Sequence, residues 1–156
     1  MAERVSARVL LIDESSRVLL VSSRDPDDGI LVWYTPGGRV EEGEDLRTAA
    51  IREIEEEVGI TLEDVSGPIW ERRFPHTFDG RSIDAHEWFF VAHVHASTIE
   101  DVSETDEGAT YFEGWRWWTI EDIRAFDGVV APRRLAELLE PILVGALPSA
   151  PIHTSE

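Results

Sequence analysis

Runs of apolar residues divide the chain into short β-strands around one long amphipathic helix. The predicted strands, rich in β-branched and aromatic residues and bounded by turn-forming residues, are 5–12, 18–23, 31–34, 69–74, 85–94 and 113–118. Residues 45–58 have helical periodicity, with Asp45 as the expected N-cap and Gly59 as the expected C′ residue. Strands that alternate with a strong central helix predict an α/β or α+β fold class.

The second half of the chain contains fewer regular elements. Residues 97–110 form a polar, acidic stretch that is typical of a loop, and a short helix is predicted at 119–126. A closing helix is predicted at 133–147, and residues 148–156 are expected to form a loose tail. Because no internal repeat or second hydrophobic pattern is present, we expect one domain over residues 1–147.

The central helix gathers carboxylates beside its apolar face. At about 100° per residue, Glu53, Glu56 and Glu57 fall within an arc of about 100°. Like charges at this spacing repel by a few tenths of a kcal/mol per pair, and they lie where the helix dipole favours cations. Two interpretations follow. The carboxylates are either a solvated acidic surface or ligands for a hard divalent cation such as Mg²⁺ or Mn²⁺.

The residues that flank this helix favour the second interpretation. Residues 38–60, GRVEEGEDLRTAAIREIEEEVGI, resemble the Nudix box at every specified position. The matching residues are Gly38, Glu44, Arg52, Glu53, Ile54, Glu56, Glu57, Gly59 and Ile60. The resemblance extends to residues 33–38, which look like the usual entry into the box, and to residues 116–122, which look like a usual late strand-to-helix passage.

The resemblance implies an α/β/α sandwich with a mixed β-sheet, in which the box forms a loop–helix–loop. It also implies that Glu53, Glu56 and Glu57 bind one or more Mg²⁺ ions, with Mn²⁺ as a possible substitute, and that the backbone at Gly38 helps. Glu44 and Arg52 are carried over as supporting catalytic residues that hold the loop and orient the ligands. The implied reaction is hydrolysis of a diphosphate linkage, in which a cation neutralises the phosphate oxygens.

The general base and the substrate contacts are less defined. The base is expected among Glu104, Glu107, Glu113 and the box glutamates, and the sequence does not choose between them. Candidate substrate contacts are Arg24, Arg39 and Arg73 for phosphates and Trp33 for a base, although each residue type is also common on surfaces or in cores. Further candidates are Arg72, Arg81, Phe78, His76 and His86, and the position of Pro75 resembles that of a proline in the ADP-ribose-cleaving subgroup.

Composition narrows the expected partners. The chain has 14 basic residues, all arginine, and 32 acidic residues, for a net charge of −18. This charge opposes binding to polymeric nucleic acid, including capped RNA, but permits a small nucleotide such as a (deoxy)nucleoside triphosphate or an ADP-ribose-like sugar when a cation bridges the two. Nothing resembles a membrane span or a signal peptide, so we expect a cytoplasmic protein that does not bind membranes.

One alternative to a simple hydrolase stays open, and a second is discounted. The chain is either an enzyme or a non-catalytic nucleotide-binding module, although such modules usually lose a box carboxylate and here all are present. Isoprenoid diphosphate isomerisation on the same scaffold uses a catalytic cysteine in its best-known form, and this chain has no cysteine. A homodimer is expected from the family resemblance alone.

Overall fold

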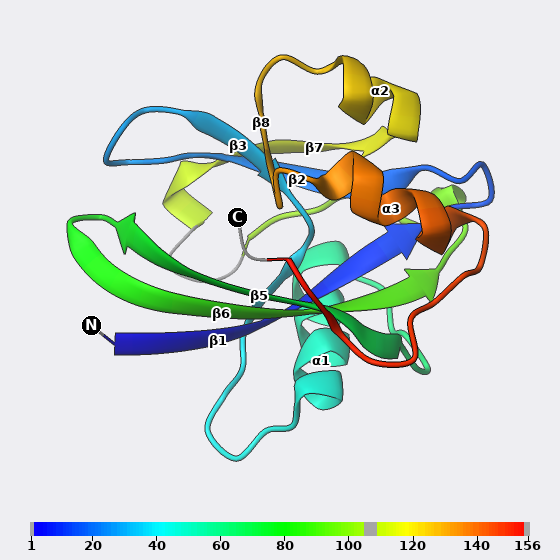
Figure 1. The fold of residues 1–156 in the computed structure, drawn as a ribbon, viewed down its shortest axis with the longest axis horizontal. Helices are drawn as coiled ribbons and strands as arrows, with labels where there is room; N and C mark the ends of the chain where they lie inside the picture. The colour runs from blue at the N-terminus through cyan, green and yellow to red at the C-terminus, as the bar shows by residue number, and fades with distance from the viewer. Residues whose placement is uncertain (1, 105–108, 155–156) are drawn as a thin grey trace.

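A computed structural model describes residues 2–104 and 109–154, which form a curled, mixed nine-stranded sheet with helices on both faces (Figure 1). The strands are β1 (Ala2–Ile12), β2 (Val18–Arg24), β3 (Leu31–Tyr34), β4 (Gly37–Arg39), β5 (Ser66–Phe78), β6 (Arg81–His93), β7 (Phe112–Trp118), β8 (Val129–Ala131) and β9 (Ile152–His153). The helices are α1 (Leu46–Val58), α2 (Ile120–Ala125) and α3 (Leu135–Leu143), with 3₁₀ turns at Ala96–Thr98 and Ala109–Tyr111. The predicted α/β/α sandwich with a mixed sheet is confirmed.

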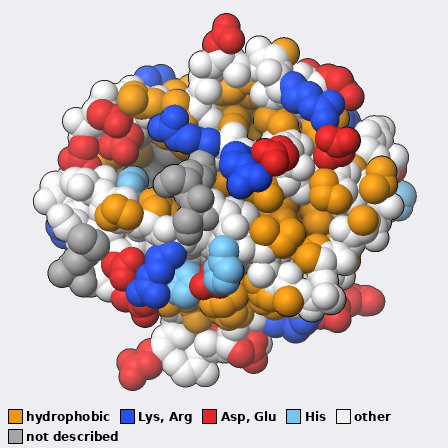
Figure 2. Space-filling view, viewed as in Figure 1, with side chains coloured by type: hydrophobic (Ala, Val, Ile, Leu, Met, Phe, Trp, Pro, Cys, Tyr) orange, Lys and Arg blue, Asp and Glu red, His pale blue; other side chains and the backbone are white. Residues whose placement is uncertain are grey.

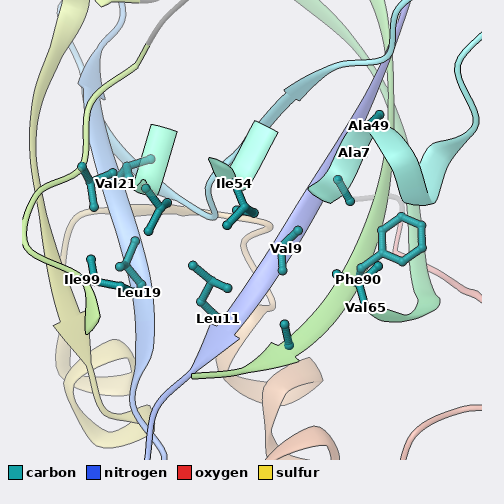
Figure 3. Packing of buried hydrophobic residues seen from close by; sticks show 14 residues of the cluster. Ala7, Val9, Leu11, Leu19, Val21, Ala49, Ile54, Val65, Phe90 and Ile99 are labelled. Carbon is teal, nitrogen blue, oxygen red and sulfur yellow. The ribbon is translucent and has the colours of Figure 1, made fainter. Parts of the chain in front are cut away.

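The alternation of side chains along β1 separates two hydrophobic cores. Ala7, Val9 and Leu11 point toward α1 and pack with its Ala49 and Ile54 (Figure 3). Leu10 and Ile12 point to the opposite face, where α3 closes the second core with the side chains of Leu135 and Leu139. Successive residues of a strand face opposite sides of its sheet, so one strand supports a helix layer on each side.

The sheet divides along one edge of β1. β6 pairs in parallel with the whole of β1, while β4 pairs with Ser6–Arg8 on its other edge and β2 pairs with it at Ile12. β3 pairs with β2, so the chain crosses from one half of the sheet to the other between Tyr34 and Gly37. This crossing brings the entry to the Nudix-like segment to the point where the two halves diverge.

Helix α1 begins and ends at the predicted residues. The Asp45 carboxylate accepts a hydrogen bond from the Thr48 N–H at 2.7 Å, which satisfies one of the free donors of the first turn. Gly59 ends the helix at a φ of 79°, a left-handed conformation that glycine adopts without strain. The short helix α2 has the capping box of Thr119 and Asp122 that its sequence indicates.

The structure differs from the sequence prediction in the hairpin and the tail. β5 and β6 are each 13 residues long, because the alternating segment 72–78 continues the pairing to the turn at Asp79–Gly80. The expectation of a loose tail after Pro148 is wrong for β9, which pairs in parallel with β5 at Trp70 and Glu71. Thr154 is buried and its N–H donates to the Glu71 carbonyl. Within the described ranges, no helix is long and apolar enough to cross a membrane.

Candidate active site

The apolar face of α1 buries two of the three predicted metal-binding glutamates together with the core residues. Glu53 and Glu57 are 5% and 4% exposed, whereas Glu56 is exposed to solvent. The buried pair occupies positions next to Ala49, Ala50 and Ile54 on the same helix. Burying a carboxylate costs stability unless a cation compensates for it, so the surroundings of each glutamate decide that cost.

Gly38 allows the Glu53 carboxylate to lie against the backbone of β4. A Cβ atom added at Gly38 would lie 2.5 Å from the Oε2 atom of Glu53, which is closer than real side chains approach. Any other residue at this position would therefore displace the carboxylate. The structure thus brings together Gly38 and Glu53, which the sequence predicts as neighbours at one metal site.

Glu57 is in an unfavourable electrostatic environment. Its Oε2 atom accepts a hydrogen bond from the Gly37 N–H at 3.2 Å. Burial and the nearby charge of Glu104 nevertheless raise the pKa of Glu57 to about 9, despite the opposing effects of Arg8 and the Gly37 N–H. Without a cation, Glu57 is therefore protonated at neutral pH.

Arg52 lies at the centre of the other box carboxylates. Its guanidinium donates to Glu44 at 2.7 and 2.8 Å and to Glu53 at 3.0 Å, and it reaches Glu56 at 3.3 Å. It also donates to the Arg39 carbonyl at 3.0 Å, which ties the loop before α1 to the helix. The hydrogen bond with Arg52 lowers the pKa of Glu44. Arg52 therefore joins Glu44, the loop before α1 and two of the box glutamates.

The donor set fits a hard divalent cation, although a complete cage is not formed. Glu53, Glu56 and Glu57 supply only oxygen atoms, which Mg²⁺ and Mn²⁺ prefer, and Gly38 leaves room beside them. Among the described residues, no group of three or more His, Asp or Glu side chains is already arranged to hold a metal ion. The Arg52 Nη1 atom contacts both Glu53 and Glu56, at 3.0 and 3.3 Å.

A cavity of about 380 Å³ opens beside Gly37 and Gly38, where the two halves of the sheet diverge. One wall comes from the inward-facing residues of β1, β5 and β6, and the other from β3 and β8. Among the residues that the structure describes, the lining contains five arginines, Arg4, Arg8, Arg24, Arg72 and Arg133, and three acidic residues, Asp25, Glu87 and Glu104. The basic residues among this lining outnumber the acidic ones, the reverse of the whole chain. On the face shown in Figure 2, arginine and acidic side chains lie near one another, with apolar side chains between them.

Glu87 connects two arginines inside the cavity. It accepts from the Arg8 Nε atom at 3.1 Å and from the Arg72 Nη1 atom at 2.9 Å. Burial alone would raise the pKa of Glu87, but the two guanidinium groups lower it below its usual value. Arg72 also stacks 3.8 Å above the centre of the Phe74 ring. Glu87 therefore orients both arginines for an anionic ligand.

Tyr34 and Thr35 add hydroxyl groups to the wall that adjoins α1. The Tyr34 hydroxyl donates a short hydrogen bond to the Glu104 Oε1 atom and lies 2.7 Å from the Ser23 Oγ atom. Thr35 is 1% exposed and lines the cavity, and its Oγ1 atom has no hydrogen-bond partner among the described residues. A buried hydroxyl without a partner is uncommon in proteins and is consistent with a ligand contact at this position.

Only one of the four predicted substrate contacts lines the cavity. Arg24 does so, although it also forms a bidentate ion pair with Glu113. Arg39 is exposed on β4, and Arg73 points away from the cavity to pair with Asp84 and Glu3. Trp33 packs edge-to-face against Trp118, with ring centres 5.1 Å apart, as part of the core around α3. Strand alternation explains these positions, because neighbouring residues face opposite sides.

Position relative to the cavity also separates the candidates for the general base. Glu104 lines the cavity and is close enough to Glu57 to affect its pKa. Glu113 is exposed and paired with Arg24, and it does not line the cavity. Glu107 lies outside the described residues. His76 also lines the cavity, whereas His86 is held by Glu71 at 2.7 Å and is not part of the lining.

Several cavity residues, among them Arg8, Tyr34 and Glu87, were not predicted from the sequence as site residues. The alternation of side chains in residues 4–8, 72–78 and 83–89 could have indicated Arg8 and Glu87, because every second residue in each segment faces the cavity. Their convergence depends on the parallel pairing of β1 with β6, which a single sequence does not reveal.

Comparisons with known proteins show the family and the fold of this chain. A family model described as NUDIX domain matches residues 2–139. The RNA pyrophosphohydrolase of Dinoroseobacter shibae is 30% identical over 137 residues, which cover 81% of each protein. The m7GpppN-mRNA hydrolase NUDT17 of Xenopus laevis is 38% identical over 71 residues, which cover 42% of this chain and 24% of that protein. The dihydroneopterin triphosphate pyrophosphohydrolase of E. coli has a similar fold, with a TM-score of 0.63 at 20% identity over 94% of this chain and 100% of that one.

Proposed function

The chain belongs to the NUDIX family of pyrophosphohydrolases, and we propose that it is a Mg²⁺-dependent hydrolase of a diphosphate linkage in a small nucleoside diphosphate derivative. The observation that carries this proposal is the buried Glu57, whose pKa is raised to about 9 beside a second buried glutamate at the edge of the cavity. A divalent cation would replace the proton on Glu57 and offset the repulsion between the carboxylates.

In this proposal Glu53, Glu56 and Glu57 hold Mg²⁺, with Mn²⁺ as a substitute, and the backbone at Gly38 assists them. When bound, the ion neutralises the phosphate oxygens and lowers the pKa of the attacking water. Arg52 and Glu44 hold the loop before α1 and orient Glu53 and Glu56. Binding of the ion requires the Arg52 guanidinium to give up part of its contacts with those two carboxylates.

The reaction adds one water molecule across the diphosphate bridge. Glu104 accepts a proton from the water as its oxygen attacks phosphorus, and the bond between that phosphorus and the bridging oxygen breaks. The bridging oxygen leaves with the other phosphate. Glu104 is our choice for the base because it lines the cavity beside Glu57, while Glu113 is held by Arg24. A box glutamate is the alternative base, and the Glu104→Ala variant distinguishes the two.

The wall of the cavity that β1, β5 and β6 form supports a nucleotide-like substrate. Arg8 and Arg72, oriented by Glu87, suit a phosphate oxygen, because guanidinium groups bind phosphates through paired hydrogen bonds. Phe74 and Phe78 line the same wall and offer flat apolar surfaces for a base. The leading substrates are therefore (deoxy)nucleoside triphosphates and ADP-ribose-like molecules.

The relative named RNA pyrophosphohydrolase makes RNA a second candidate substrate. The net charge of −18 opposes it, since a polyanion would be repelled at low salt. The test is a panel of (deoxy)nucleoside triphosphates, ADP-ribose and a short 5′-triphosphate RNA, each incubated with Mg²⁺ in ¹⁸O-labelled water. Mass spectrometry identifies the products and the phosphorus that gains the label. We expect turnover of a small nucleotide, and no turnover of any compound would reject the hydrolase in favour of a binding module.

Two further expectations concern the setting of the protein. We propose that it acts in the cytoplasm and that it forms a homodimer, neither of which depends on the site described above. Light scattering after size-exclusion chromatography would report a mass near twice 17.6 kDa for the dimer. A mass near 17.6 kDa would reject the dimer and leave the catalytic proposal unchanged.

A further inference from the structure

We infer that Tyr34 is a positioning residue, whose hydroxyl fixes the carboxylate of Glu104 so that it faces the reacting water. The inference rests on the proposed function, because it assigns Tyr34 a role through the proposed base. Tyr34 lies on β3 and not on the box helix α1. Its hydroxyl is joined to Glu104 by a direct hydrogen bond, although the two residues are 70 positions apart in the sequence.

The backbone before Glu104 is anchored beside the end of α1. Val102 is 3% exposed and packs in the core that also contains Val58 of α1. The Ser103 N–H donates to the Glu57 carbonyl at 2.9 Å. These two contacts hold the main chain at Glu104 close to Glu57, but neither of them fixes the direction of the Glu104 side chain.

Tyr34 provides that second constraint from a rigid position. It lies on β3, where it pairs with Val21 of β2 and Ala131 of β8, so strands flank it on both sides. Its ring lies 5.4 Å from the Arg8 guanidinium, and its hydroxyl contacts both Ser23 and Glu104. Burial and the charge of Glu104 raise the pKa of Tyr34 well above its ordinary value, so the hydroxyl keeps its proton and donates it.

Tyr34 and Glu104 differ in how firmly the backbone holds them, and this difference indicates that Tyr34 orients Glu104. Tyr34 is fixed by strand pairing on both sides, whereas residues 101–104 belong to no helix or strand. The glutamate side chain has several rotamers, and a hydrogen bond to one carboxylate oxygen selects among them. A base that deviates from its productive direction loses rate without losing substrate affinity, because the water and not the substrate is misplaced.

The test compares the kinetics of Tyr34→Phe and Tyr111→Phe in the wild type and in a Glu104→Ala background. The assay uses Mg²⁺ and whichever compound of the panel has the highest kcat/KM. We expect Tyr34→Phe to lower kcat by roughly 10- to 100-fold, with KM within about twofold of wild type. In the Glu104→Ala background the same substitution should have almost no further effect. Tyr111→Phe removes the chain's other phenolic hydroxyl, and any change in kcat that it causes should be the same in both backgrounds.

A second readout does not need the loaded enzyme. In EDTA, Tyr34→Phe should lower Tm by about 3–6 °C in the wild type and by clearly less in the Glu104→Ala background, because the hydrogen bond is absent there. Full kcat in Tyr34→Phe, or an equal loss of kcat in both backgrounds, would overturn the positioning role alone. A wild type that turns over no compound would instead reject the proposed function, and with it the role of both residues.

Discussion

Glu57 and Glu87 are two carboxylates beside the same cavity, and their surroundings have opposite effects. Glu87 lies between Arg8 and Arg72, which keep it ionised although it is only 12% exposed. Glu57 accepts a hydrogen bond from one backbone N–H, and its burial, together with the charges of Glu104 and Glu53, raises its pKa to about 9. A buried carboxylate that has its cations within the chain is part of the structure. A buried carboxylate that is not held between such cations is suited to bind a cation from solution.

Removal of Glu87 should therefore have the largest effect on stability. Glu87→Ala leaves Arg8 buried without its principal carboxylate, and we expect a loss of about 3–5 kcal/mol in the free energy of unfolding, measured by urea denaturation. Asp84→Ala is the matched control, because Asp84 lies on β6, the same strand as Glu87, and its partner Arg73 is exposed. That loss should be much smaller, because solvent screens an exposed ion pair. Equal losses in the two variants would mean that the Glu87 pair is not stabilising.

Removal of the Glu57 charge should affect the reaction instead. Glu57→Gln should lower kcat by about 10²-fold or more, because one ligand of the ion is lost while the side-chain volume is kept. Glu55→Gln, which changes an exposed glutamate two residues away, should keep kcat within about twofold. Glu57→Gln with wild-type kcat under saturating Mg²⁺ would contradict the role given to this carboxylate.

The same substitution should stabilise the protein when metal is absent. Because the pKa of Glu57 is raised from 4.5 to about 9 on folding, its protonated form contributes stability that is complete below pH 4.5 and is lost progressively as the pH rises toward 9. Glutamine does not titrate. In EDTA at pH 8, we expect Glu57→Gln to gain about 1–2 kcal/mol, or roughly 3–6 °C in Tm, and to gain less at pH 5. A gain independent of pH would mean that Glu57 is not a titrating group.

Arg72 and Arg73 allow a smaller test of which strand face meets the substrate. Arg72 lines the cavity and Arg73 does not. We expect Arg72→Met to raise KM by roughly 3- to 10-fold and Arg73→Met to leave it within about twofold, measured by initial rates with the preferred nucleotide. A larger effect of Arg73→Met would reverse the assignment of the two faces of β5.

The sequence predicted the acidic side of this comparison better than the basic side. Asp45, Gly59 and the spacing of Glu53, Glu56 and Glu57 are local features, since caps and helical periodicity depend on residues within a few positions of one another. The position of Gly38 against Glu53 followed from the motif resemblance and agrees with the structure.

The basic side depends on pairing between distant strands. Arg8, Arg72 and Glu87 meet because β1, β6 and β5 lie side by side, and no local pattern sets that order. Arg73 and Trp33 looked equivalent to their neighbours by residue type, and only the direction of each side chain in the sheet separates them. The pairing of the tail with β5 at Trp70 and Glu71 also joins segments that are distant in the sequence, and β9 has only two residues.

The most direct test of the central claim is a calorimetric titration of Mg²⁺, repeated with Mn²⁺, into the metal-free protein and into Glu57→Gln and Glu55→Gln. We expect saturable binding to the wild type and to Glu55→Gln, with release of a proton from the wild-type site above pH 7 and at least tenfold weaker binding to Glu57→Gln. Equal affinity in all three proteins, or no binding to any of them with or without nucleotide, would contradict the claim that the crowded carboxylates of α1 hold a divalent cation.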